Sequence, residues 1–205
     1  ADSRTILYIE KDPVTLLGLR VRKHVLGTDP KSDALVYEQD DPSFYTSVYT
    51  TRDDRYVVIY AESTVSSEMR YADAADPKLD FRVFLPRERD HQYQAQHLDG
   101  RSIIRTNWQA KNFRVMEARA GEESDRTKWR ELLGHRDDAF VNDFDAFSGF
   151  LAVDERSGGL RRIRIHPWSA AKDTFIASDD PTYAFALADN HEIDTDHVRY
   201  TYDSL

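Results

Sequence analysis

A pattern of a polar turn followed by an apolar strand recurs along this chain at intervals of about 48 residues. Aligning three copies places Tyr56, Ser102 and Phe150 in register, at spacings of 46 and 48 residues, and Thr5 and Val198 extend the series. A period of this size is typical of radial repeats, because one four-stranded sheet cannot cover its own apolar faces. The repeat predicts an all-β fold, a partial β-propeller of about four blades, each a four-stranded antiparallel sheet.

The expected strands are short runs of β-branched and aromatic residues bounded by turn residues. The first blade is expected to supply its second, third and fourth strands, at 6–10, 20–24 and 34–37. Three complete blades follow, with strands at 45–49, 56–60, 68–73 and 82–85, at 93–97, 102–107, 113–118 and 129–133, and at 142–147, 150–155, 160–165 and 174–176. A fifth blade begins with 182–187 and 198–203. Segment 122–132 also fits a helix, but the blade register favours a strand for its second half.

Because the series starts and stops inside blades, the ring that it describes is open. We interpret residues 1–205 as a segment of the propeller domain of a larger protein. Open sheet edges pair readily with other chains, so self-association of this segment is expected.

Composition excludes several classes of partner. The net charge is -9 and the basic residues are interleaved with acids, which argues against a nucleic-acid surface and favours cationic peptides. No segment approaches the roughly 18 to 20 consecutive apolar residues that span a bilayer, so no membrane partner is expected. The chain has no cysteine, which excludes disulfides and thiolate chemistry.

The sequence lacks recognisable catalytic and cofactor motifs. The G-x-S-x-G turn of α/β-hydrolases does not occur, so no nucleophile is assigned. Segment 191–197 is rich in acids and histidine but has no calcium-loop glycine, and we interpret it as a solvated loop. Gly158 and Gly159 are interpreted as a tight turn, because no helix start follows them. We therefore predict no catalytic, cofactor-binding or metal-binding residues in this chain, and no cofactor.

Several phrases resemble the prolyl oligopeptidase family of serine peptidases, and within it the oligopeptidase B group. They are D-A-L-V-Y-E at 33–38, F-L-P-R at 84–87 with D-H-Q-Y at 90–93, R-T-N at 105–107 with K-N-F at 111–113, E-R at 155–156 with G-L at 159–160, and D-D-P-T-Y at 179–183. The resemblance implies a seven-bladed propeller that caps an α/β-hydrolase domain and admits short basic peptides, cleaved after Arg or Lys.

The same resemblance implies that residues 1–205 belong to the N-terminal cap and that the catalytic domain lies outside this chain. The serine, aspartate and histidine of the family belong to that domain, so the segment alone is expected to be inactive. The full-length protein is expected to be a cytoplasmic serine endopeptidase.

The blade map also predicts a working face. In a propeller, the connections from strand two to strand three and from strand four to the next blade emerge on the same side of the disc. Segments 87–91 and 179–182 are connections of the second kind, and 107–112 and 155–159 of the first. We predict that this face packs on the catalytic domain or lines the access route for peptides. Its candidate residues are Arg87, Arg89, Asp90, His91, Asn107, Lys111, Asn112, Glu155 and Arg156.

Three function classes remain open on the sequence alone. The first is a cap that filters the substrates of a serine oligopeptidase by size. The alternative is a non-enzymatic propeller used as a protein-interaction platform. The third is a sugar-processing enzyme, which needs two carboxylates at one pocket; Asp143 and Asp145 share a strand face, but nothing directs them to a substrate.

Overall fold

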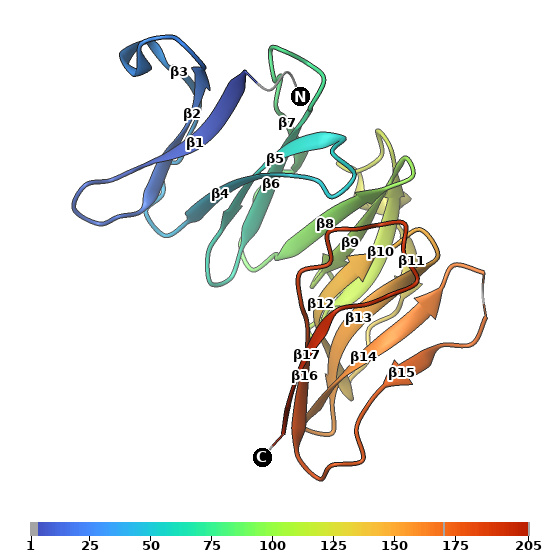
Figure 1. The fold of residues 1–205 in the computed structure, drawn as a ribbon. Coiled ribbons are helices and arrows are strands. Elements are labelled where there is room, and N and C mark those ends of the chain that lie inside the picture. Colours follow the sequence, from blue (N-terminus) through green and yellow to red (C-terminus); the bar gives the residue numbers. More distant parts are fainter. Residues whose placement is uncertain (1–3, 170, 205) are drawn as a thin grey trace. The chain divides into compact units, whose positions relative to one another are not determined.

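The computed structural model describes residues 4–169 and 171–204, and their regular secondary structure is almost entirely antiparallel β-sheet (Figure 1). The chain divides into two compact units, one ending at Gln92 and one starting at Tyr93. The predicted all-β partial propeller is confirmed, because successive sheets repeat the same up-and-down strand order.

Unit 1 contains two sheets that follow the predicted blade order. The first has the order β1 (Thr5–Lys11), β2 (Gly18–Val25) and β3 (Ala34–Glu38), with the short 3-10 helix η1 (Pro30–Ser32) before β3. The second has the order β4 (Tyr45–Thr50), β5 (Tyr56–Glu62), β6 (Ser67–Asp73) and β7 (Arg82–Leu85). Each strand pairs with the next, so the three-strand and four-strand predictions both hold for this unit.

Unit 2 contains two four-stranded sheets and a two-stranded one. The first runs through β8 (Tyr93–Leu98), β9 (Arg101–Thr106), β10 (Arg114–Arg119) and β11 (Arg130–Leu133), with the 3-10 helix η2 (Arg126–Lys128) before β11. The second runs through β12 (Ala139–Ala146), β13 (Phe150–Ser157), β14 (Leu160–Pro167) and β15 (Thr174–Ile176). The last pairs β16 (Tyr183–Leu187) with β17 (Tyr200–Ser204).

The core of unit 2 lies between its sheets. Strand β13 is buried on both faces, since Leu151, Ala152 and Val153 are all fully buried. Leu151 and Val153 join one apolar cluster, with Ile103 and Phe144, while Ala152 joins a second. A strand covered on both faces reads as a continuous apolar run, which explains why the alternation typical of half-exposed strands is absent here.

The glycine turn between β13 and β14 has the predicted tight geometry. Ser157 pairs with Leu160, so Gly158 and Gly159 are the two loop residues of the hairpin. Their φ angles are 60° and 85°, a conformation that glycine adopts without a steric penalty.

A ladder of charged side chains recurs in the first sheet of unit 1 and in the β12–β15 sheet of unit 2. A glutamate on one strand contacts two arginines on the next, and the histidine two residues further on contacts an aspartate. We call each set an ionic ladder; the sets are Glu10, Arg20, Arg22, His24 and Asp33, and Glu155, Arg162, Arg164, His166 and Asp173. The underlying repeat is R-V-R-K-H at 20–24 and R-I-R-I-H at 162–166.

The structure corrects some element bounds. The helix considered for 122–132 is replaced by η2 and β11, so the strand interpretation is confirmed. Strand β12 begins at Ala139, three residues before its predicted start, and β17 begins at Tyr200, two residues after its predicted start. The helical segments found in residues 4–169 and 171–204 have three residues each, far fewer than a bilayer-spanning helix requires.

Candidate functional site

The connections that the blade map assigns to the working face lie at one end of the sheets in unit 1. They are the β1–β2, β3–β4, β5–β6 and β7–β8 segments, and hydrogen bonds join them. The Gln39 backbone N–H donates to the Leu19 carbonyl at 2.7 Å, beside the β1–β2 turn. The Asp90 N–H donates to Ser66 Oγ at 3.2 Å. We call residues 12–17, 39–44, 63–66 and 86–92 the loop face of unit 1.

Arg87 is held against the protein rather than presented to solvent. Its guanidinium carbon lies 3.6 Å from the centre of the Phe44 ring, within the range of a cation–π contact. Its backbone N–H donates to a carboxylate oxygen of the buried Glu68 at 3.2 Å. This arginine therefore fastens the β7–β8 connection to the β3–β4 connection.

The other three predicted residues of unit 1 divide by exposure. The side chains of Arg89 and Asp90 are 91% and 71% exposed, and their charged groups approach within 3.7 Å of each other. His91 is buried, and its carbonyl accepts a hydrogen bond of 3.1 Å from the Ser67 N–H. Arg89 and Asp90 are thus available to a partner, while His91 supports the loop.

In unit 2, Asn107, Lys111 and Asn112 form the β9–β10 loop as predicted. The Asn112 side chain donates to the carbonyl of Arg136 at 2.9 Å and to that of Asp137 at 3.2 Å. Lys111 Nζ lies 3.0 Å from the Asp137 carboxylate, and both side chains are more than 70% exposed. Asn107 closes the turn through its carbonyl, which accepts from the Ala110 N–H at 3.0 Å.

The prediction that Glu155 and Arg156 belong to a loop is wrong. Both lie in β13, which runs on to Ser157 because the two glycines form the whole turn. The Glu155 side chain is 2% exposed and accepts two hydrogen bonds from Arg162, at 2.8 and 2.6 Å. Arg156 lies over the Phe140 ring at 5.6 Å. Glu155 is therefore a structural carboxylate inside the ionic ladder.

Arg136, in the connection between β11 and β12, was missed by the sequence analysis. It lies 3.5 Å from Glu155 and forms a two-point contact with Asp138, whose pKa is lowered by this hydrogen bond. Its carbonyl accepts from Asn112, so Arg136 joins the β9–β10 loop to β13. The predicted connection at 179–182 lies between β15 and β16. We call residues 107–112, 134–138, 158–159 and 177–182 the loop face of unit 2.

The two aspartates of β12 do not form a catalytic pair. One oxygen of Asp145 accepts from Gln96 at 3.1 Å and the other from Asn190 at 2.9 Å. Burial raises the pKa of Asp143, and its carboxylate accepts from the Phe144 N–H at 2.8 Å. Both groups are engaged in holding the inner strand, which leaves no support for the sugar-processing function.

The segment 188–199 is a loop, as predicted for its acidic and histidine-rich part. Asn190 closes it by accepting from the Arg199 N–H at 2.7 Å and donating to the Arg199 carbonyl at 3.1 Å. Among residues 4–169 and 171–204, no cluster of His, Asp or Glu side chains is arranged to hold a metal ion.

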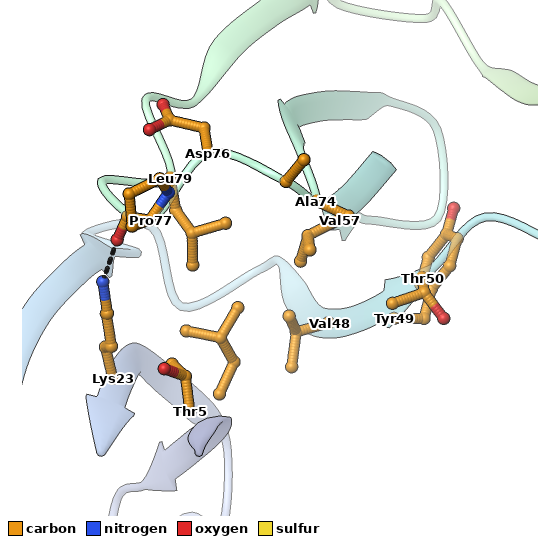
Figure 2. A pocket seen from close by; sticks show the side chains of 12 residues that line it. Thr5, Lys23, Val48, Tyr49, Thr50, Val57, Ala74, Asp76, Pro77 and Leu79 are labelled. Atoms are coloured by element: carbon orange, nitrogen blue, oxygen red, sulfur yellow. Dashed lines mark hydrogen bonds between the residues drawn. The ribbon is translucent and has the colours of Figure 1, made fainter. Parts of the chain in front are cut away.

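A cavity of about 540 Å³ lies in unit 1, between its two sheets and away from the loop face. Most of its lining is apolar, and Figure 2 shows the Leu79 side chain directed into the cavity and Lys23 reaching the carbonyl of Pro77. The lining includes no serine, histidine or cysteine, so the cavity contains neither a Ser–His nor a Cys–His pair. The lining residues are Thr5, Leu7, Lys23, Val48, Tyr49, Thr50, Val57, Ala74, Ala75, Asp76, Pro77 and Leu79.

Comparison with known proteins identifies relatives over the full chain. Dipeptidyl aminopeptidase BI of Pseudoxanthomonas mexicana is 46% identical over 205 residues, which are all of this chain and 28% of that protein. Protease 2 of Moraxella lacunata is 24% identical over 184 residues, 89% of this chain and 26% of that protein.

A solved structure has the same fold. Oligopeptidase B from Trypanosoma brucei, with covalently bound antipain in a closed form, superposes with a TM-score of 0.89 at 23% identity. The match covers 99% of this chain and 30% of that one. The chain thus spans between a quarter and a third of the length of these relatives.

The family described as "Prolyl oligopeptidase, N-terminal beta-propeller domain" matches residues 1–205. The sheet order, the strand repeat and the relatives agree with that match. This chain therefore belongs to the prolyl oligopeptidase family, as its N-terminal β-propeller domain.

Proposed function

We propose that this chain is part of the propeller cap of a serine oligopeptidase that cleaves short peptides after Arg or Lys. The observation that carries the proposal is the family match over all 205 residues. Relatives named Protease 2 and oligopeptidase B support peptide-bond hydrolysis as the reaction of the whole protein. In this proposal the catalytic serine, aspartate and histidine lie outside this chain, and the enzyme works in the cytoplasm.

The cap contributes selection rather than bond chemistry. It packs on the catalytic domain through the loop faces, and it excludes substrates too large to pass into the enclosed site. The charged side chains of Arg89, Asp90 and Lys111 support this role, because they are more than 70% exposed and can be reached by another domain. The net charge of -9 favours cationic peptides as they approach.

A second peptidase activity is supported by the relative with 46% identity. Its name, dipeptidyl aminopeptidase, denotes an enzyme that removes two residues at a time from a free amino terminus. An exopeptidase of this kind needs to recognise the terminal ammonium, whereas an oligopeptidase tolerates a blocked terminus. The two proposals therefore differ in one measurable property of the substrate.

The test uses the complete gene product and matched chromogenic peptides. Peptides ending in Arg, Lys, Leu or Pro before the leaving group are compared, each with a free and with an acetylated amino terminus. Cleavage after Arg and Lys regardless of acetylation supports the oligopeptidase. Loss of cleavage on acetylation supports the dipeptidyl aminopeptidase instead.

Size selection is tested with the same preparation. Arg-containing peptides of about 5, 15 and 40 residues are compared with a folded protein that has exposed Arg residues. Equal turnover of the folded protein contradicts filtering by the cap. If no peptide is cleaved at all, the peptidase proposal fails and the interaction-platform function takes its place.

A further inference from the structure

The turn between β1 and β2 presents apolar side chains to solvent. Val14 is 87% exposed and Leu16 is 67% exposed, the two highest values among the large apolar residues that the structure describes. Single exposed apolar residues are common on proteins, but two at one projecting tip form a local apolar knob. We call residues 12–17 the apolar hairpin.

The apolar hairpin is held in a fixed conformation. One carboxylate oxygen of Asp12 accepts from the Val14 N–H at 2.9 Å, from the Thr15 N–H at 2.7 Å and from the Thr15 hydroxyl at 3.0 Å. Two backbone hydrogen bonds add to these. The Asp12 N–H donates to the Leu17 carbonyl at 2.8 Å, and the Asp12 carbonyl accepts from the Leu16 N–H at 2.9 Å. The knob is therefore preorganised, which lowers the entropy lost when a partner binds it.

Leu16 occupies a costly backbone conformation. Its φ is 61°, in the left-handed region where glycine or asparagine is favoured. Leucine is unfavourable here for two reasons: its backbone is strained and its apolar side chain is exposed to water. Strain that persists at an exposed position is typical of recognition sites.

The apolar hairpin belongs to the loop face of unit 1. Leu19, just after the hairpin, accepts the hydrogen bond from Gln39, and Arg87 contacts both Gln39, at 3.5 Å, and Phe44. The same face carries the exposed side chain of Val65 in the β5–β6 turn. The apolar hairpin is thus continuous with the surface that we assign to packing on the catalytic domain.

We propose that the apolar hairpin docks, through Val14 and Leu16, into an apolar recess on the catalytic domain of the longer polypeptide. This inference rests on the proposed function and names the contact that fastens the cap. We choose the catalytic domain as the partner because of the relatives' length. This chain matches 26 to 30% of their length, so most of each relative lies outside the match. A domain tethered in the same polypeptide covers the knob at high effective concentration.

Cysteine labelling of the complete gene product tests the docking. The chain has no cysteine, so Leu16→Cys and the control Leu26→Cys each introduce a single thiol into residues 1–205. Leu26 is 47% exposed and lies in the β2–β3 turn, at the opposite end of the same sheet. Maleimide labelling of each site is followed by mass spectrometry of the digested protein. Docking predicts labelling at least about tenfold slower at position 16 than at position 26.

Each outcome decides the proposal. Equal labelling rates at the two positions overturn it. Slow labelling of Leu16→Cys that disappears on hundredfold dilution also overturns it, because a second copy then covers the knob. Slow labelling that is independent of concentration supports it. The labelling rate does not depend on peptidase activity. If position 16 is shielded but no peptide is cleaved, the peptidase proposal fails while the docking stands.

A second variant separates docking from folding. Leu16→Asn keeps a residue that accepts the left-handed backbone and removes the apolar side chain. In the complete protein we expect severalfold faster hydrogen exchange in residues 86–92, on the same loop face, with β5 unchanged. Leu26→Asn is the matched control. Unchanged exchange in residues 86–92 of Leu16→Asn contradicts the docking.

Discussion

Neutralising Glu155 is expected to lower the free energy of unfolding of unit 2 more than removing an exposed ion pair does. The carboxylate is almost fully buried and has three guanidinium groups around it, those of Arg162 at 2.6 Å, Arg136 at 3.5 Å and Arg164 at 3.8 Å. Glu155→Gln keeps the size of the side chain and one acceptor but removes the negative charge. The three arginines then repel one another across a region that is only partly open to water.

The magnitude follows from the geometry. A pair of unit charges about 4 Å apart gains about 4 kcal/mol at an effective dielectric constant of 20, and desolvation offsets much of that gain. Breaking a buried pair costs about 3–5 kcal/mol. The arginine side chains are 21 to 36% exposed, so solvent screens part of the repulsion. We expect a loss of about 2–3 kcal/mol, which lowers the melting temperature of a domain this size by roughly 4–12 °C.

Urea unfolding followed by tryptophan fluorescence is the assay. All three tryptophans, Trp108, Trp129 and Trp168, belong to unit 2, so the signal reports the unit that contains Glu155. Asp138→Asn is the control, because Asp138 pairs with the same Arg136 but its side chain is 69% exposed. The reasoning is refuted if Glu155→Gln and Asp138→Asn shift the urea midpoint equally at an unchanged m value.

Three further predictions concern the pH response, the glycine turn and the sheet edges. Burial raises the pKa of Asp33. The hydrogen bonds with His24 and Tyr8 together lower it by more than burial raises it, so the pKa lies below the ordinary value of aspartate. Above the ordinary aspartate pKa such a group stabilises the fold, and this contribution is lost as the pH falls. Asp33→Asn should therefore lower the urea midpoint followed by far-UV circular dichroism at pH 7 and flatten its decline toward pH 3, and an unchanged pH profile argues against this. Gly159→Val, at a φ of 85°, should cost about 1–2 kcal/mol, whereas Gly158→Asn should be tolerated in the same thermal melt. The 205-residue chain should self-associate through the edges of β1 and β17, and Thr201→Lys should reduce the mass seen by light scattering; a monomer at high concentration contradicts this.

Much of the fold was predictable because the strand repeat is local. Each predicted strand overlaps an observed one, and β15 has the predicted bounds. One error occurs at the end of a strand, where the turn is shorter than expected. Strand β13 was predicted to stop at Glu155, but it runs on to Ser157 because Gly158 and Gly159 form the whole turn.

The candidate site was less predictable than the fold. Sequence placed Arg87, Arg89, Asp90 and His91 in one connection, but the exposure of each depends on contacts with other loops. Arg136 gave no signal, because its role comes from a carbonyl that accepts a side chain 24 residues away. Leu16 was missed for a similar reason. A leucine in a turn is unremarkable in sequence, and only its positive φ and exposure mark it.

The ionic ladders also bear on how the protein folds. Their contacts join residues only 7 to 12 positions apart, as in Glu10 with Arg20 and Glu155 with Arg162. Contacts so close in sequence cost little loop-closure entropy, so we expect them to form early in folding. A sheet fastened in this way can assemble while the next one is still being synthesised. In a protein made of repeated sheets, we expect the two sheets that carry a ladder to offer a growing chain early surfaces on which the following sheet packs.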